Sequence, residues 1–125
     1  MPMPETASGA RAVVRRYLDA IAAQDWATAG DCLCHDVRRI GPFGDVYQGR
    51  EQYLAFLSHL MPTLAGYRME IERVLTAGTG GTVLAQLAET VEMDGRAVVT
   101  PESLIFELDG HDAIREIRIY IQQLS

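Results

Sequence analysis

The sequence has 125 residues, with 17 Asp and Glu against 11 Lys and Arg, all of them Arg, and a formal net charge of −6. Its 48% hydrophobic and 22% charged residues are typical of one globular domain with a real core, and argue against a disordered, collagen-like or disulfide-stapled chain. The acidic balance argues against nucleic acid or an anionic membrane as partner, because both bind basic patches. We expect a small apolar molecule instead.

The N-terminal third predicts an arm followed by two helices. Residues 1–8 hold two prolines and little that can be buried, so we expect a loose arm there and a single domain over residues 9–125. Apolar residues then recur at spacings of three and four up to about Gln24, which is typical of one face of a helix. Asp25 is a typical N-cap for a second, short helix that reaches about Cys34.

The next segment predicts a strand, a loop and a third helix. Residues 37–40 indicate a brief strand. Residues 41–45 contain two glycines and a proline, which favours a loop or bent ribbon. A third helix opens at Gly49 and closes at Pro62, because proline stops a helix just past the apolar stripe.

From Tyr67 onward the apolar period changes from 3.6 to 2, which indicates strands. Asp94-Gly95 tolerates the positive φ angles of a two-residue hairpin turn. We therefore predict an α+β fold, with three N-terminal helices packed on a strongly curved antiparallel sheet. Its four long strands are one from Tyr67 to a glycine-rich turn over residues 76–82, and three over residues 83–93, 96–108 and 114–121.

The two cysteines predict no disulfide, because Cys32 and Cys34 on a helix would point about 200° apart. Reduced thiols, with no signal-peptide pattern and no apolar run of roughly 18 residues, predict a cytoplasmic protein without a membrane segment. His35 beside them indicates no metal site, since a second ligand cluster is missing. His59 and His111 are expected in solvent.

The hairpin register places two glutamates on an otherwise apolar face. With a two-residue loop, Leu87 faces Glu102 and Glu89 faces Thr100, so the two carboxyl groups are diagonal neighbours. Burial and mutual repulsion raise carboxyl pKa values, which yields a general acid or base that works near neutral pH. Glu89 and Glu102 are therefore candidate catalytic residues.

A purely structural role for these polar residues is the alternative. Sheet curvature would place both glutamates at a wet rim, or an arginine such as Arg73 or Arg96 would neutralise them. Tyr17 lies on the apolar stripe of the first helix, where it either presents its hydroxyl to a cavity or is an ordinary core tyrosine. Nucleotide chemistry is unsupported, because neither a phosphate loop nor a serine nucleophile elbow is present.

Several short motifs follow one another in a specific order: Tyr17 on the first helix, Asp25-Trp26, Asp36-Val37, Gly41-Pro42-Phe43-Gly44, Gly49-Arg50-Glu51-Gln52-Tyr53 and the Asp94-Gly95 hairpin. Over nearly the whole chain this order resembles the nuclear transport factor 2-like superfamily, and most of all its SnoaL-like polyketide cyclases and ketosteroid isomerases. The resemblance implies a conical, cystatin-like fold with a deep apolar pocket and dimerisation through the outer face of the sheet.

The resemblance also implies which catalytic positions are kept. Tyr17 matches the tyrosine that donates to the developing enolate oxygen in ketosteroid isomerases. Their catalytic base, an Asp before Pro-Phe-Gly, falls on Gly41, and their second acidic donor falls on Leu104 or Ser103. Without a base in reach of the proton, ketosteroid isomerisation itself is not expected. The same loss weakens a likeness to polyether epoxide hydrolases.

We therefore predict a SnoaL-like protein, homodimeric and cytoplasmic, that binds an apolar ring-containing molecule. If it is an enzyme, it catalyses isomerisation, cyclisation or dehydration without cofactor or metal: Glu89 or Glu102 moves the proton, and Tyr17 stabilises charge on a substrate oxygen. The alternative is a non-catalytic ligand-binding or dimerisation module of the same fold. The predicted pocket-lining residues are Val14, Trp26, Phe43, Phe56, Leu87, Leu104, Phe106, Ile119 and Ile121.

Overall fold

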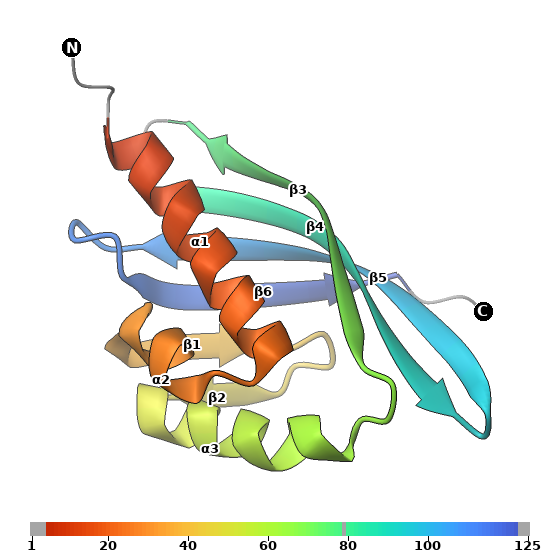
Figure 1. Ribbon diagram of the computed structural model, residues 1–125. Helices are drawn as coiled ribbons and strands as arrows, with labels where there is room; N and C mark the ends of the chain where they lie inside the picture. The colour runs from red at the N-terminus through yellow and green to blue at the C-terminus, as the bar shows by residue number, and fades with distance from the viewer. Residues whose placement is uncertain (1–4, 79, 123–125) are drawn as a thin grey trace.

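The computed structural model describes residues 5–78 and 80–122, and within them three α-helices lie against one face of a six-stranded sheet (Figure 1). This arrangement confirms the predicted α+β class with three N-terminal helices. No helix in these ranges is long and apolar enough to cross a membrane. The elements are α1 (Glu5–Ala23), α2 (Trp26–Asp31), β1 (Leu33–Ile40), β2 (Val46–Gln48), α3 (Arg50–Leu60), the 3₁₀ turn η1 (Met61–Thr63), β3 (Arg68–Ala77), β4 (Thr82–Met93), β5 (Arg96–Leu108) and β6 (Ile114–Ile121).

Local signals in the sequence set where the helices begin. The Asp25 side chain accepts a hydrogen bond from the Thr28 amide (3.2 Å) and so caps α2, as predicted. Gly49, at φ 97°, supplies the left-handed backbone conformation from which α3 starts. α1 already includes residues 5–8 of the predicted loose arm, whereas residues 1–4 lie outside the described part of the chain.

The β4–β5 hairpin has the predicted register. Asp94 (φ 54°) and Gly95 (φ 76°) form its two-residue turn, since both adopt the left-handed backbone angles that such a turn needs. Leu87 pairs with Glu102, two positions along β4 from Glu89. Because side chains alternate between the faces of a strand, the two glutamates emerge on the same face of the sheet.

The strands lie in the order β2-β1-β6-β5-β4-β3, and their pairing departs from the prediction in one respect. β1 pairs in parallel with β6, so the sheet is mixed rather than antiparallel. β1 also begins at Leu33, where we expected a helix as far as Cys34, and residues 46–48 form a strand that the sequence did not indicate. The pairing of Leu33 with Ile114, far away in the chain, overrides the local helical spacing.

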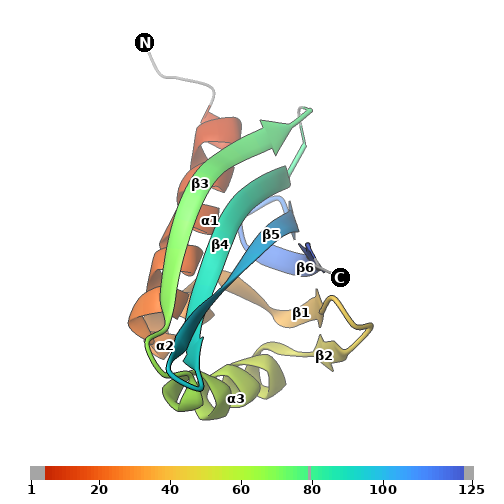
Figure 2. The ribbon, with the colours of Figure 1, turned by 90° about the vertical axis from the view of Figure 1, so that its right-hand side faces the viewer.

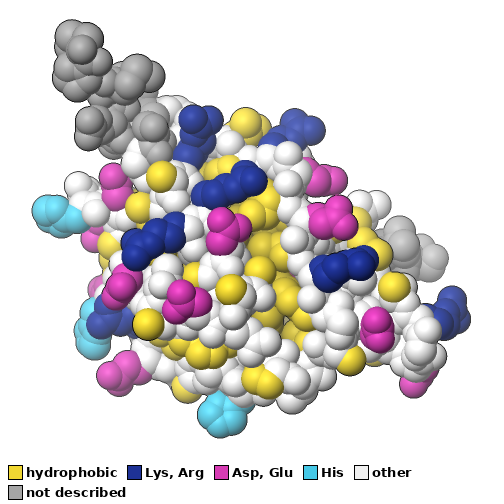
Figure 3. Space-filling model, viewed as in Figure 1, with side chains coloured by type: hydrophobic (Ala, Val, Ile, Leu, Met, Phe, Trp, Pro, Cys, Tyr) yellow, Lys and Arg dark blue, Asp and Glu magenta, His cyan; other side chains and the backbone are white. Residues whose placement is uncertain are grey.

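The sheet bends around the helices, with α1 across its concave face and α3 below it (Figure 1, Figure 2). Burial decreases along this face toward the hairpin tip: Val83 is fully buried, whereas Met93 is 57% exposed. Glu89 and Glu102 lie between these extremes and are half-buried. At the surface, hydrophobic side chains form a band between α1 and β3, where the helices meet the edge of the sheet (Figure 3).

Candidate functional site

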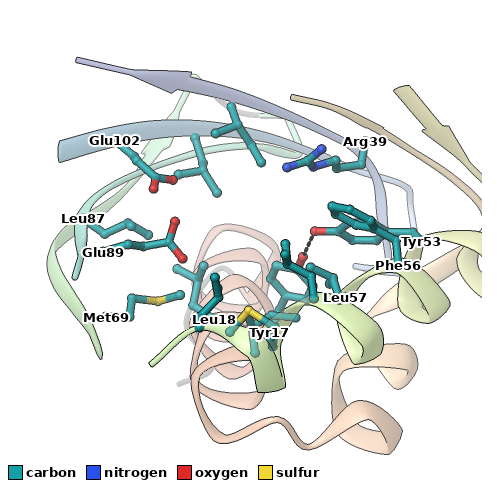
Figure 4. A pocket seen from close by; sticks show the side chains of 16 residues that line it. Tyr17, Leu18, Arg39, Tyr53, Phe56, Leu57, Met69, Leu87, Glu89 and Glu102 are labelled. Carbon is teal, nitrogen blue, oxygen red and sulfur yellow. Dashed lines mark hydrogen bonds between the residues drawn. The ribbon is translucent and has the colours of Figure 1, made fainter. Parts of the chain in front are cut away.

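A cavity of about 140 Å³ lies between the helices and the concave face of the sheet (Figure 4). Helices α1 and α3 with η1 contribute one wall, and the long strands with β1 contribute the other. Its polar side chains lie at two opposite ends, separated by apolar ones. The apolar lining includes Leu18, Leu57, Met61, Met69, Leu87 and Leu104.

Two glutamates form one end of the cavity, which we call the acid end. Glu89 from β4 and Glu102 from β5 point inward with their carboxyl groups side by side (Figure 4). Tyr67, just before β3, donates a hydrogen bond from its hydroxyl to Glu89. Within the described residues neither glutamate forms an ion pair, and Arg73 and Arg96 are both exposed. The two arginines considered from the sequence therefore do not neutralise this pair.

The surroundings of Glu102 keep it protonated. Burial raises the pKa of Glu102 to about 10, the hydrogen bond to Glu89 and the charge of Glu89 add to this rise, and the charge of Arg39 opposes it. Burial also raises the pKa of Tyr67, and the charge of Glu89 adds to that effect. Glu89 thus accepts hydrogen bonds from two donors, Tyr67 and Glu102. A carboxylic acid beside a proton acceptor can give one proton and take another.

A pair of tyrosines lies at the opposite end. Tyr17 from α1 and Tyr53 from α3 share a hydrogen bond of 2.6 Å between their hydroxyl oxygens (Figure 4). Tyr17 also packs edge-on against Phe106, with ring centroids 5.9 Å apart, so it is a core residue that also lines the cavity. Burial raises the pKa of both hydroxyls. Because one mutual hydrogen bond uses only one of the two protons, the other can be donated to a ligand oxygen.

Arg39 on β1 brings a positive charge to the same end, which we call the cationic end. Its side chain is only 12% exposed and points toward the cavity (Figure 4). Its Nη1 donates to Asp45 Oδ2 at 2.6 Å. The guanidinium carbon lies 5.6 to 5.9 Å from the ring centroids of Tyr47, Tyr53 and Phe56, which are favourable cation–π distances.

The two positions at which the resemblance places acidic catalytic groups carry none here. A Cβ atom at Gly41 would collide with Asp45 Oδ1 and would lie 2.7 Å from Arg39 Nη1, so the ion pair occupies the space that a side chain would need. Leu104 lines the cavity as part of its apolar wall, and Ser103 points to the other face of the sheet. Among the described residues that line the cavity, carboxyl groups are therefore found only at the acid end.

Seven of the residues singled out in the sequence line the cavity. They approach it from α1, α3, β4, β5 and β6, and so from segments far apart in the chain. They are Tyr17, Phe56, Leu87, Glu89, Glu102, Leu104 and Ile119.

Five predicted lining residues lie elsewhere, and these predictions are wrong. Val14 and Phe106 are fully buried in the core behind the cavity wall, and Trp26 packs against that core from α2. Phe43 is 74% exposed on the β1–β2 loop, where it borders a surface hollow together with Ile121. Periodicity identifies the inward face of an element, but it does not separate core from cavity along that face.

Three polar residues of the site were missed from the sequence: Arg39, Tyr53 and Tyr67. The signals for them are present but weak. Arg39 lies two positions after the buried Val37, so a strand places both on one face. Tyr53 belongs to the apolar stripe of α3, and Tyr67 precedes Met69 in the alternating pattern. None of these patterns indicates that the three side chains converge.

The cysteine and histidine residues take no part in the site. Cys32 and Cys34 are free thiols. Burial raises the pKa of Cys34 to about 11, and its hydrogen bond to Asp109 adds to the rise, so this thiol is a poor nucleophile. His59 and His111 are exposed. Within the described ranges, no three His, Cys, Asp or Glu side chains are grouped to hold a metal ion.

The model of the SnoaL-like domain matches residues 14–117 of this sequence. The chain belongs to this family. Three solved structures show the same fold. An LEH-like epoxide hydrolase from M. tuberculosis superposes with a TM-score of 0.80 at 22% identity, over 95% of this chain and 86% of that one. A protein described as a SnoaL-like polyketide cyclase from Jannaschia sp. CCS1 superposes with a TM-score of 0.82 at 21% identity, over 98% of this chain and 91% of that one.

A protein described as a ketosteroid isomerase from Kribbella flavida DSM 17836 gives a TM-score of 0.80 at 18% identity, over 95% of this chain and 82% of that one. No protein of curated function matches the sequence significantly. Identities this low show the shared SnoaL-like fold alone, because one fold supports many chemistries.

Proposed function

We propose that this SnoaL-like protein binds an apolar, ring-containing small molecule and catalyses its isomerisation, cyclisation or dehydration by proton transfer without a cofactor. The observation that carries the proposal is the pairing of Glu102, protonated at neutral pH, with Glu89 inside an apolar cavity. Epoxide hydrolysis, ketosteroid isomerisation and polyketide cyclisation, for which the similar structures are named, also move protons, which supports the proposal by analogy.

The acid end can dehydrate a β-hydroxy ketone and then restore itself. Glu89 removes the hydrogen next to the carbonyl group while Glu102 protonates the departing hydroxyl, so that water leaves and a carbon–carbon double bond forms. The proton on Glu89 then passes to Glu102 through their hydrogen bond. A hydrogen bond from Tyr17 stabilises the negative charge that develops on the carbonyl oxygen, by about 3 kcal/mol in a favourable site.

Isomerisation of a β,γ-unsaturated ketone needs the base Glu89 but no proton from Glu102. Glu89 carries the proton from the α carbon to the γ carbon, and the double bond moves into conjugation with the carbonyl group. Glu102 keeps its proton throughout. Dehydration therefore needs both glutamates, whereas isomerisation needs Glu89 alone. Measuring one substrate of each kind separates the two roles.

The size of the cavity limits the ligand. Its volume of about 140 Å³ is close to the roughly 150 Å³ of an apolar protein cavity that holds one benzene molecule. We therefore choose single-ring test compounds, 3-hydroxycyclohexanone for dehydration and 3-cyclohexen-1-one for isomerisation. Both yield 2-cyclohexen-1-one, whose conjugated carbonyl is followed by ultraviolet absorbance.

The experiment compares Glu89→Gln and Glu102→Gln with wild type on both compounds. Glu89→Gln should slow both reactions by about 10²–10⁴-fold, the usual contribution of a general base. Glu102→Gln should slow dehydration much more than isomerisation, because only dehydration needs its proton. Glu92→Gln, also on β4 but exposed near the hairpin tip, is the matched control and should change neither rate.

Two outcomes would contradict the proposal. Wild-type turnover that neither glutamine variant changes would remove the carboxyl groups from the mechanism. Binding of both compounds without turnover would favour the alternative, a ligand-binding module, which also fits the absence of acidic side chains at Gly41 and Leu104.

We infer that the protein is a homodimer formed through the convex face of the sheet. Three large side chains on this face are about half exposed, namely Leu75, Val99 and Tyr120. Burying exposed apolar side chains of this kind is a common reason for dimerisation. Val99→Glu should then shift the molecular mass in sedimentation equilibrium from dimer to monomer, and a wild type that is already monomeric would contradict the inference.

The cytoplasmic location stays a prediction, supported by the two free thiols.

A further inference from the structure

Arg39 is a charged group in the cavity wall to which the proposed proton chemistry assigns no role. Its guanidinium is held in a fixed place: Asp45 accepts a hydrogen bond from Nη1, and three aromatic rings surround the central carbon. Arginine is strongly basic and stays charged in proteins, and the side chain of Arg39 is only 12% exposed. The charge stands at the end of the cavity away from Glu89 and Glu102 (Figure 4).

The Nε atom of Arg39 is buried and has no hydrogen-bond partner among the described residues. Buried donors in folded proteins almost always have an acceptor, and a charged donor without one is costly. Asp45 already occupies Nη1, and Arg39 lines the cavity. Nε itself has almost no accessible surface, so we expect a ligand in the cavity to accept from the other N–H groups of the guanidinium, of which Asp45 occupies only Nη1.

The neighbouring groups indicate the chemistry of that acceptor. Tyr17 and Tyr53 are donors at neutral pH, so this end presents an arginine and two hydroxyl groups to a ligand. A carbonyl oxygen accepts from such donors. A carboxylate is less suitable, because Asp45 already balances the charge of Arg39 and Glu89 lies in the same cavity.

We propose that Arg39 determines substrate specificity by binding the carbonyl oxygen of a neutral, single-ring ketone whose reactive carbon then faces Glu89 and Glu102. The position of the reactive carbon rests on the proposed function, whereas binding of the carbonyl oxygen by Arg39 does not. The cavity thus orients its ligand, with an oxygen acceptor at the cationic end and a proton to be removed at the acid end. This arrangement selects ketones over hydrocarbons of the same shape.

The test compares two ligands that differ in little except the acceptor. Cyclohexanone and methylenecyclohexane have nearly the same shape, but only the ketone carries an oxygen. Dissociation constants from NMR titration of the wild-type protein should favour cyclohexanone by about tenfold or more, the effect expected of one hydrogen bond from a charged donor.

Arg39→Met should remove this preference and leave the affinity for methylenecyclohexane within about twofold. Arg38→Met is the matched control, because Arg38 is the preceding residue of β1 and its side chain lies on the opposite face, half exposed. It should keep the full preference. Arg39→Lys retains the charge without the planar set of donors, so its preference should fall several-fold, and it serves as the test if Arg39→Met does not fold.

Every other result overturns the inference. A wild-type protein that binds both compounds equally, or an Arg39→Met or Arg39→Lys variant that keeps the full preference, shows that Arg39 does not bind the oxygen. Binding of neither compound overturns this inference and the proposed ligand class together. Since Glu89→Gln should keep the preference while losing turnover, a failure of the proton chemistry is recognised separately.

Discussion

The two ends of the cavity bury charged groups in opposite ways. At the acid end, Glu102 has no cation beside it among the described residues, and it is accommodated by keeping its proton. At the cationic end, the intrinsically basic guanidinium of Arg39 is charged, and Asp45 and three aromatic rings lie around it. The first end therefore holds a proton that can move, whereas the second holds a charge that stays in place.

The largest expected effect is the pH dependence that the acid end imposes on stability. The pKa of Glu102 is about 10 in the folded protein and has its ordinary value, near 4.5, in the unfolded chain. Between these values the folded state holds a proton that the unfolded state releases, so the free energy of unfolding falls as pH rises. Urea denaturation should show a loss of up to about 4 kcal/mol from pH 5 to pH 8, at about 1.4 kcal/mol per pH unit.

Glu102→Gln removes this titration and should give a flatter profile, with higher stability than wild type at pH 8. Glu107→Gln is the control, because Glu107 lies on the same strand but on the other face, where it accepts a hydrogen bond from Thr82. It should keep the slope of the wild type. Equal slopes in wild type and Glu102→Gln would mean that the acid end holds no extra proton.

The cationic end is tested next by filling the space beside it. In Gly41→Ala the new methyl group would meet the carboxylate of Asp45 and Nη1 of Arg39, so the ion pair must shift. Overpacking of this kind costs about 1–3 kcal/mol. Gly110→Ala, where a Cβ atom meets nothing within 4 Å, should stay within about 0.5 kcal/mol of wild type in the same denaturation assay. Equal stability of the two variants would show that the ion pair is easily displaced.

The two ends also differ in how far the sequence could predict them. Asp94-Gly95 fixes the hairpin register locally, so the shared face of Glu89 and Glu102 follows from turn chemistry and a period of two. Arg39 reaches the cavity through β1, whose parallel pairing with β6 joins segments far apart in the chain. Local spacing carries no information on such a partner, and for the same reason Phe43 was wrongly placed in the pocket.

A smaller effect is expected from the tyrosine pair that accompanies Arg39. Tyr17→Phe and Tyr53→Phe should each lower the free energy of unfolding by about 1–2 kcal/mol, because each leaves a buried hydroxyl without its partner. The double variant should cost less than the sum of the two, with a coupling of about 1 kcal/mol. Tyr120→Phe, at a half-exposed site, is the control and should have little effect. Additive losses would mean that the hydroxyls do not stabilise one another.

The smallest effect is expected from Asp45→Asn, which tests whether Arg39 depends on the negative charge of Asp45. The Asp45 side chain is 42% exposed, and asparagine keeps an oxygen that can accept from Arg39, so only charge attraction is lost. The loss should be below about 1 kcal/mol and should shrink as salt is added. Asp31→Asn, whose carboxylate lies 4.0 Å from the exposed Arg16, should change nothing measurable. A loss above about 2 kcal/mol that salt does not reduce would show that Arg39 depends on a buried counter-ion. The charge at each end of the cavity would then depend on a second group, a proton at Glu102 and the carboxylate of Asp45 at Arg39. The charge at the cationic end would no longer be fixed independently of Asp45.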